Sequence, residues 1–282
     1  MSADDLTTDD LATDDLTTGH DGSAGEAAER ALSDALGRLA TTPRLLVALD
    51  FDGTLAPEVD APMEARALPE SVDAVRRLVA QEGTTVALVS GRDISSLLRI
   101  AEVPEEVVLV GSHGIEVRID GETTTLTDEE AARRVVISDA LHGAADGREG
   151  VYVEEKPAGL ALHTRLADEA TTAEVRDAVQ QRLRDVPGVH EREGKNVREY
   201  AVRPTGKDDG VARLREHFGA TAVLYAGDDV TDEDALRSLG EGDVGVKVGP
   251  AETSAAHRVA DPEAVARLLT ELADLRDHLG HA

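Results

Sequence analysis

The sequence has 282 residues, enough for one large domain or two modest ones, and 41% of them are hydrophobic, which is sufficient for a sizeable core. Its 57 Asp and Glu residues outnumber the 29 Lys and Arg residues, and a net charge of −28 argues against binding to nucleic acid or to anionic lipid. The sequence has no Cys, which excludes disulfides, thiol catalysis and Cys-ligated metal sites.

The chain begins with an acidic five-residue repeat over residues 4–18. This charge density, without a helical or strand period, predicts a disordered tail over residues 1–25. The sequence has no run of 18 apolar residues and no basic, apolar leader, so we expect no membrane span, no signal peptide and a cytoplasmic protein. Leucines at helical spacing predict a helix over Glu26–Ala40.

Short apolar segments at Leu45–Leu49, Thr85–Val89 and Val107–Val110 predict strands that are buried on both faces, with a helix over Pro69–Gln81 between the first two. This alternation indicates parallel βαβ units, whose ligands bind beyond the carboxyl ends of the strands. The same pattern returns after Pro204, with elements expected at Asp208–Phe218, Ala222–Ala226, Thr231–Leu239, Val244–Val248 and Pro262–Leu279.

Residues 115–203 follow another pattern. Asp120-Gly121 between two alternating segments, Ile115–Ile119 and Glu122–Leu126, favours a hairpin. The elements expected after it are Asp128–Leu141, Val151–Lys156, Leu160–Thr164, Ala173–Val186, His190–Glu193 and Val197–Val202. Hairpins with two helices predict an α+β unit over 115–203, inserted into an α/β core made of residues 26–114 and 204–282.

Carboxylates gather after two of the core strands. Asp50 and Asp52 directly follow the first strand, and their like charges are hard to hold together without a cation. A second acidic cluster follows the strand at 222–226 and comprises Asp228, Asp229, Asp232 and Glu233. An Asx-turn or an acidic helix start could explain either cluster alone. Two such clusters at the expected ligand edge predict Mg²⁺, because it prefers hard oxygen ligands.

Polar and basic residues also lie at the ends of predicted elements of the core. Ser90 ends the second strand, where its hydroxyl can donate to a phosphate oxygen, and Gly91 and Arg92 come next; a cap and turn is the alternative. Lys207 begins a helix, where a cation is electrostatically unfavourable. It is one of only four lysines in an Arg-rich chain, which favours a function that needs a compact point charge.

In their order along the chain, these motifs resemble those of the haloacid dehalogenase-type phosphatases: DFDGT at 50–54, Ser90-Gly91-Arg92, Lys207, and Gly227-Asp228-Asp229 with Asp232. That class often has Gly after the Lys, and this chain has Asp208. Within the class, the resemblance is to the trehalose-6-phosphate phosphatases, on the motifs GSHGIE at 111–116, Glu154-x-Lys156, His163-x-Arg165, and Gly194-Lys195 with Glu199.

The resemblance implies a Rossmann-like parallel-sheet core with an inserted α+β cap that sets substrate specificity. It implies that Asp50 is the nucleophile, that Asp52 is the general acid and base, and that Ser90 and Lys207 hold the transferring phosphate. It further implies that Mg²⁺ is held by Asp50, the main-chain carbonyl of Asp52, and Asp228, with Asp229 and Asp232 further out.

In the cap, the resemblance implies that Glu154, Lys156 and Glu199 bind the sugar, and we expect Gly91 and Arg92 of the core to bind substrate as well. We expect His113 and His163 to have structural roles in the core or at a hinge.

The implied activity is Mg²⁺-dependent hydrolysis of trehalose 6-phosphate through an aspartyl-phosphate, by a monomer without nucleic-acid or membrane partners. One alternative is a related phosphatase for sucrose phosphate or a glycosyl phosphoglycerate. A second is a phospho-receiver signalling module, against which the spacing of Asp50 and Asp52 and the large insertion both argue. A third is a catalytically inactive binding protein.

Overall fold

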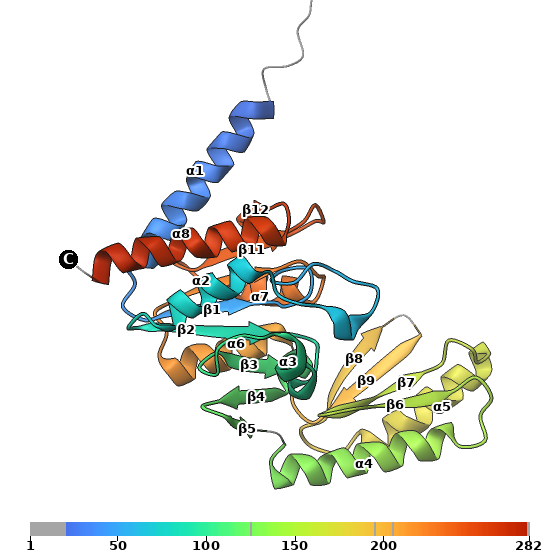
Figure 1. Ribbon diagram of the computed structural model, residues 1–282. Coiled ribbons are helices and arrows are strands. Elements are labelled where there is room, and N and C mark those ends of the chain that lie inside the picture. The colour runs from blue at the N-terminus through green and yellow to red at the C-terminus, as the bar shows by residue number, and fades with distance from the viewer. Residues whose placement is uncertain (1–20, 125, 195, 205, 281–282) are drawn as a thin grey trace, which may run out of the picture.

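Two β-sheets organise the part of the chain that the computed structural model describes, which is residues 21–124, 126–194, 196–204 and 206–280 (Figure 1). The larger sheet has eight strands and the smaller sheet has four. The chain builds most of the larger sheet, leaves it to build the smaller one, and then returns to complete the larger one. The expected α/β core with an inserted α+β unit is therefore confirmed.

The larger sheet is parallel from its first edge to β3 and antiparallel beyond it. Its central strand β1 is buried at all five positions, as its unbroken apolar sequence predicts. In spatial order the strands are β12 (His257–Val259), β11 (Val244–Val248), β10 (Ala222–Gly227), β1 (Leu45–Leu49), β2 (Thr84–Val89), β3 (Val108–Gly111), β4 (Glu116–Ile119) and β5 (Glu122–Thr124).

Helices cover both faces of this sheet. The side chains of β1 point alternately to the two faces and are apolar on both, so each face has to be buried. Leu45, Val47 and Leu49 pack in one apolar cluster, whereas Leu46 and Ala48 pack in another. The first cluster includes α1 (Asp21–Ala40), α2 (Pro69–Val79), α3 (Ile94–Ile100) and α8 (Pro262–Gly280), and the second includes α6 (Lys207–Phe218) and α7 (Asp232–Ser238). Short 3₁₀ turns lie at Pro62–Glu64 (η1) and Ser112–Gly114 (η2).

The hairpin expected in the inserted unit belongs instead to the larger sheet. Its first strand, β4, pairs antiparallel with β3, and Val110 is opposite Val117. Val117 is buried in the apolar cluster of the larger sheet, and this burial stabilises the hairpin at that edge. The expectation that the inserted unit begins at residue 115 is corrected by this pairing.

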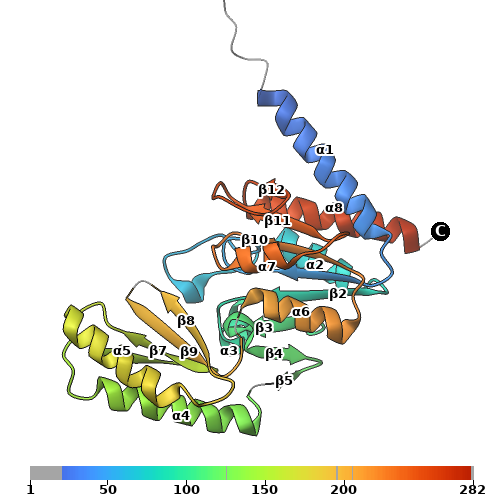
Figure 2. The same ribbon diagram turned by 180° about the vertical axis from the view of Figure 1, so that it is seen from behind.

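The smaller sheet, with the order β6-β7-β9-β8, is entirely antiparallel and is covered by helices on one face. Leu160, Leu162 and Tyr200 lie on that face and pack against the helices. The other face of the smaller sheet is directed toward the larger sheet (Figures 1 and 2). These elements are β6 (Tyr152–Lys156), β7 (Gly159–His163), β8 (His190–Gly194), β9 (Val197–Ala201), α4 (Asp128–Ala145) and α5 (Glu169–Leu183). We call them the cap.

The two ends of the described chain meet at α1 and α8. Among the residues of α1 whose exposure the structure describes, the buried ones lie in its C-terminal part, and the first half of the helix runs away from the sheet (Figure 1). Arg276 of α8 is buried and donates to the main-chain oxygens of Ala40, Thr42 and Glu82 at 3.1, 3.0 and 3.2 Å. This one guanidinium therefore ties the end of α1 to the loop before β1 and to the loop between α2 and β2.

The acidic tail expected over residues 1–25 is tested only in part. Residues 1–20 lie outside the described residues, whereas residues 21–25 are helical and belong to α1, which corrects that end of the expectation. Extending a helix that is already nucleated by packing costs little, which explains the earlier start. None of the helices in the described ranges is long and apolar enough to cross a membrane.

Candidate active site

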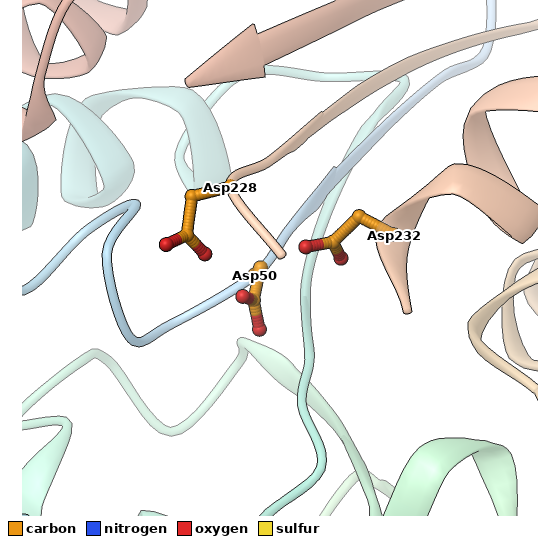
Figure 3. A group of neighbouring side chains, drawn as sticks. All are labelled: Asp50, Asp228 and Asp232. Atoms are coloured by element: carbon orange, nitrogen blue, oxygen red, sulfur yellow. The ribbon is translucent and has the colours of Figure 1, made fainter. Parts of the chain in front are cut away.

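Three carboxylates meet where β1 and β10 end. Asp50, Asp228 and Asp232 each offer an oxygen within 4.8 Å of the other two, and Figure 3 shows them grouped around one point. β1 and β10 are neighbouring parallel strands, so residues that follow them reach the same edge of the sheet. Gly53 makes room for the group, because a Cβ atom at this position, where φ is +69°, would lie 1.9 Å from Oδ2 of Asp228.

Lys207, at the start of α6, is the cation of this cluster. Its Nζ lies 2.9 Å from Oδ1 of Asp50 and 2.7 Å from Oδ1 of Asp232, and its side chain is 3% exposed. Burial opposes the charged form, but the two carboxylates outweigh burial and raise the pKa of Lys207. The unfavourable position of a cation at the start of a helix is therefore compensated by Asp50 and Asp232.

Asp232 is already saturated with hydrogen bonds. Its Oδ1 also accepts from the Tyr225 hydroxyl at 2.5 Å, and its Oδ2 accepts from the main-chain N–H of Asp229 at 2.8 Å. Tyr225 and Asp232 are both fully buried. Because its oxygens have partners, Asp232 is suited to hold Lys207 in place, while Asp50 and Asp228 keep oxygens available for a cation.

The two available carboxylates resist ionisation in the absence of a cation. Burial raises the pKa of Asp50 to about 8, against the opposing effect of Lys207. Burial, followed by the charges of Asp232 and Glu58, raises the pKa of Asp228 to about 6. Oxygen ligands at this spacing, with a shortage of positive charge, fit a hard divalent cation.

Asp52 and Arg92 form a pair that the sequence did not reveal. Arg92 donates to both oxygens of Asp52, at 2.6 and 2.7 Å, in the forked geometry of a strong charge-assisted contact. Ser90 is buried beside them, and its Oγ accepts from the N–H of Arg92 at 3.1 Å. Asp52, Ser90, Gly91 and Arg92 all line the same hollow as the acidic cluster.

A second hollow adjoins the first and lies between the core and the cap. Lys156 and Glu199, which line it, form an ion pair across the open face of the cap sheet. Arg192, another residue of this face, lies 3.6 Å from Asp234 of α7. Charged, hydrogen-bonding groups thus line a cleft that leads from the cap to the acidic cluster.

Glu154 lies on the same open face but is not among the residues that line this cleft. Its Oε2 lies 2.7 Å from Nε2 of His163, whose ring stacks on Tyr152 with centroids 4.3 Å apart. His163 is therefore a residue of the cap surface, which corrects the expectation of a core or hinge role. His113 is exposed in the cleft, which corrects the expectation of a core role there.

Lys247 is a residue of the site that we did not assign from the sequence. It is 1% exposed, and its Nζ donates to the main-chain oxygens of Asp228 and Asp229 at 2.6 and 3.1 Å. It also lies 3.5 Å from Glu233. The rarity of lysine in this chain was the available signal, because two of the four lysines, Lys207 and Lys247, turn out to hold the acidic cluster.

The ends of β1, β2 and β10 and the start of α6 bring these groups together in the arrangement of a haloacid dehalogenase-type phosphatase core with a cap. The comparison with protein families is more specific, since the trehalose-phosphatase family model matches residues 48–264. The chain therefore belongs to the trehalose-phosphatase family.

Known relatives agree with this assignment. A trehalose-phosphate phosphatase of Mycobacterium marinum is 32% identical over 278 residues, which cover 91% of this chain and 70% of the relative. A structure of Aspergillus fumigatus trehalose-6-phosphate phosphatase superposes with a TM-score of 0.73 at 25% identity and covers 86% of this chain and 97% of that one. A Mycobacterium tuberculosis protein described as an uncharacterized glycosyl hydrolase is 33% identical over 92% of this chain, but the chain spans only 21% of that relative.

Proposed function

We propose that this protein hydrolyses trehalose 6-phosphate to trehalose and inorganic phosphate. The observation that carries the proposal is the continuity of two hollows: the acidic cluster with Lys207 lies next to a cleft lined by Lys156 and Glu199. A sugar phosphate needs both parts, one for its phosphate and one for its hydroxyl groups. Membership of the trehalose-phosphatase family supports the choice of sugar.

The nucleophile is the Asp50 oxygen that does not face Lys207. It forms a bond to phosphorus as the bond from phosphorus to the sugar oxygen breaks, which gives an aspartyl-phosphate. Asp52 donates the proton that the departing sugar oxygen needs. Asp52 then takes a proton from a water molecule, whose oxygen attacks phosphorus, releases phosphate and restores the Asp50 carboxylate.

The charge of the phosphate is balanced by two cationic side chains of this chain and one metal cation, and a neutral hydroxyl adds a hydrogen bond. Lys207 and Ser90 hold phosphate oxygens, and Arg92 can exchange Asp52 for a phosphate oxygen as substrate enters. Asp50, Asp228 and the main-chain carbonyl of Asp52 would hold Mg²⁺, which would supply positive charge to offset the carboxylates and the phosphate. Asp232 keeps Lys207 oriented, and Lys247 fixes the turn that carries Asp228.

The cap recognises the sugar. Lys156, Glu199 and Glu154 offer charged hydrogen-bonding groups for hydroxyls, and closure of the cap removes bulk water from the reacting centre. We take the cap as residues 128–203, because the hairpin before it belongs to the larger sheet. A monomeric state and a cytoplasmic location remain part of the proposal.

The test is phosphate release from a panel of monoesters, measured with Mg²⁺ and with a chelator. The panel contains trehalose 6-phosphate, sucrose 6-phosphate, glucose 6-phosphate and a glycosyl phosphoglycerate. We expect Mg²⁺-dependent release with the highest kcat/KM for trehalose 6-phosphate, and none from an Asp50→Asn variant. A higher kcat/KM for another member would refute the sugar assignment and keep the chemistry, whereas undiminished turnover by Asp50→Asn would refute the chemistry.

A further inference from the structure

His113 stands at the junction of the two parts of the cleft. One part contains the acidic cluster and the other contains the pair Lys156–Glu199; His113, Lys207 and Thr231 line both. Lys207 is already committed to carboxylates of the core. A substrate whose phosphate reaches the acidic cluster and whose sugar reaches the cap therefore has to pass the His113 ring.

The backbone that presents this ring is strained. Ser112, His113 and Gly114 have φ values of 51°, 54° and 94°, so two residues with side chains adopt the left-handed conformation in succession. Strain of this kind persists where the surrounding structure enforces it, and it concentrates at functional sites. Here the N–H groups of Ser112 and His113 donate to the oxygens of Arg92 and Ser90, at 2.7 and 3.1 Å.

The same loop leaves space for the ring. A Cβ atom at Gly91 would lie 2.6 Å from Cε1 of His113, so the absence of a side chain there allows the ring to lie over the loop. Among the residues that the structure describes, none is recorded as a hydrogen-bond partner of the imidazole, which is open to the cleft. The surrounding protein, together with the charges of Lys207 and Lys156, lowers the pKa of His113. A neutral imidazole offers one donor and one acceptor.

We propose that His113 hydrogen-bonds to a sugar hydroxyl next to the phosphate ester and so selects sugar phosphates over other phosphate monoesters. The inference rests on the proposed sugar-phosphate hydrolysis and adds a specificity residue that belongs to the core rather than to the cap. A hydroxyl both donates and accepts, which matches the neutral ring. The hydrogen bonds to Ser90 and Arg92 couple the position of the ring to the loop that lines the phosphate end of the cleft.

The experiment compares two substrates on the full chain with Mg²⁺: trehalose 6-phosphate, and p-nitrophenyl phosphate, which has no sugar hydroxyl. We expect His113→Gly to lower kcat/KM for trehalose 6-phosphate about tenfold, the value of roughly one net hydrogen bond, and to leave p-nitrophenyl phosphate within about twofold. His113→Asn should retain part of the sugar activity, because Asn tolerates the left-handed backbone and can still donate and accept. His217→Asn, on the distant end of α6, is the matched control and should change neither substrate.

Thermal melting separates this role from a structural one. Gly adopts the left-handed backbone without strain, so His113→Gly should melt at or above the temperature of the parent protein. Equal losses on both substrates, or unchanged sugar activity in His113→Gly, would overturn the assignment of His113. Failure of the proposed function would look different from failure of the His113 assignment. In that case the parent protein itself would hydrolyse p-nitrophenyl phosphate and show no preference for a sugar phosphate. The proposed role of His113 would then be refuted as well.

Discussion

The core and the cap face each other across one cleft, yet they hold their charges in opposite ways. In the core, the side chains of Lys207 and Asp232 are 3% and 0% exposed. On the cap, the side chains of Lys156 and Glu199 are 37% and 36% exposed. A buried ion pair has few alternative partners, and losing one member leaves the other charge uncompensated. An exposed pair contributes little to stability and exchanges partners readily.

Under the proposed function, this difference separates two tasks. The buried charges of the core would fix the positions of the reacting groups, so changing them should affect every substrate. The exposed charges of the cap would exchange each other for substrate hydroxyls, so changing them should affect only substrates that carry a sugar. Substitutions in the two regions therefore test this division.

Replacing Lys207 should have the largest effect. We expect Lys207→Met to lower kcat by roughly 10²- to 10³-fold on both trehalose 6-phosphate and p-nitrophenyl phosphate, because a buried charge that stabilises the transferring phosphate is lost. Lys207→Arg should not restore activity, since a guanidinium is larger than the fully enclosed site of the ammonium. Steady-state kinetics on both esters measures the effect, and a loss confined to the sugar phosphate would contradict the division.

Gly53→Ala should act on the cation. The added Cβ atom would lie 1.9 Å from Oδ2 of Asp228, so this carboxylate has to move, and we expect Mg²⁺ affinity to fall about 10- to 100-fold. Gly242→Ala is the matched control, because φ there is +89° but nothing lies within 4 Å of the added atom. The control should cost about 1 kcal/mol of stability without changing Mg²⁺ affinity. Calorimetric titration with Mg²⁺ measures both; equal affinities in the two variants would show that Asp228 does not hold the cation.

The affinity for Mg²⁺ should rise with pH. The pKa values of Asp50 and Asp228 are raised to about 8 and about 6, and both groups must lose their protons to bind a cation. We expect affinity to rise by up to about tenfold per pH unit between pH 6 and pH 8. Titrations at three pH values measure this, and a flat profile would contradict it.

The same shifts predict the stability of the protein in the presence of a chelator. Both folded pKa values lie above the unfolded value of 3.8, so the native state binds more protons than the unfolded state in this window. These two groups therefore lower the free energy of unfolding as pH rises from about 4 to about 8. We expect Asp50→Asn to reduce this slope in thermal melts, and an unchanged slope would show that another group causes it.

Changes in the cap should be the smallest and the most selective. We expect Glu199→Gln to lower kcat/KM for trehalose 6-phosphate about tenfold and to leave p-nitrophenyl phosphate unchanged, because a charge-assisted contact to a hydroxyl is weakened. Glu155→Gln is the matched control on the opposite face of the same sheet, where Glu155 pairs with Arg134 of α4. A similar loss for both esters in Glu199→Gln would contradict a recognition role.

Much of the core could be predicted because its strands are buried on both faces. The apolar run at Leu45–Leu49 coincides with β1, and Val244–Val248 coincides with β11. The hairpin was assigned to the wrong sheet because alternation identifies a strand but not its partner. The choice of sheet depended on the burial of Val117 in an apolar cluster that also contains residues far away in the chain, such as Val211, and no local pattern records such a contact.

The membership of the site could be predicted, but the pairings within it could not. Asp50, Ser90 and Asp228 follow the ends of predicted strands and Lys207 begins a predicted helix, and the topology of a parallel sheet brings these positions to one edge. The hydrogen bonds that occupy Asp232, and the pairing of Arg92 with Asp52, depend on side-chain directions that spacing does not determine. The catalytic and binding roles of these residues stay predictions until the variants are measured.

The contact of Arg276 with the end of α1 has a consequence for how the protein is made. The guanidinium and the oxygen of Ala40 are 236 positions apart in the chain, and β1 lies directly between β2 and β10. During synthesis, the strand that carries Asp50 therefore emerges long before the strand and the helix that complete its surroundings. A nascent chain stopped after the cap would display Asp50 without Lys207, Asp228 or Asp232, so the ribosome has to release nearly the whole chain before the chemistry can begin.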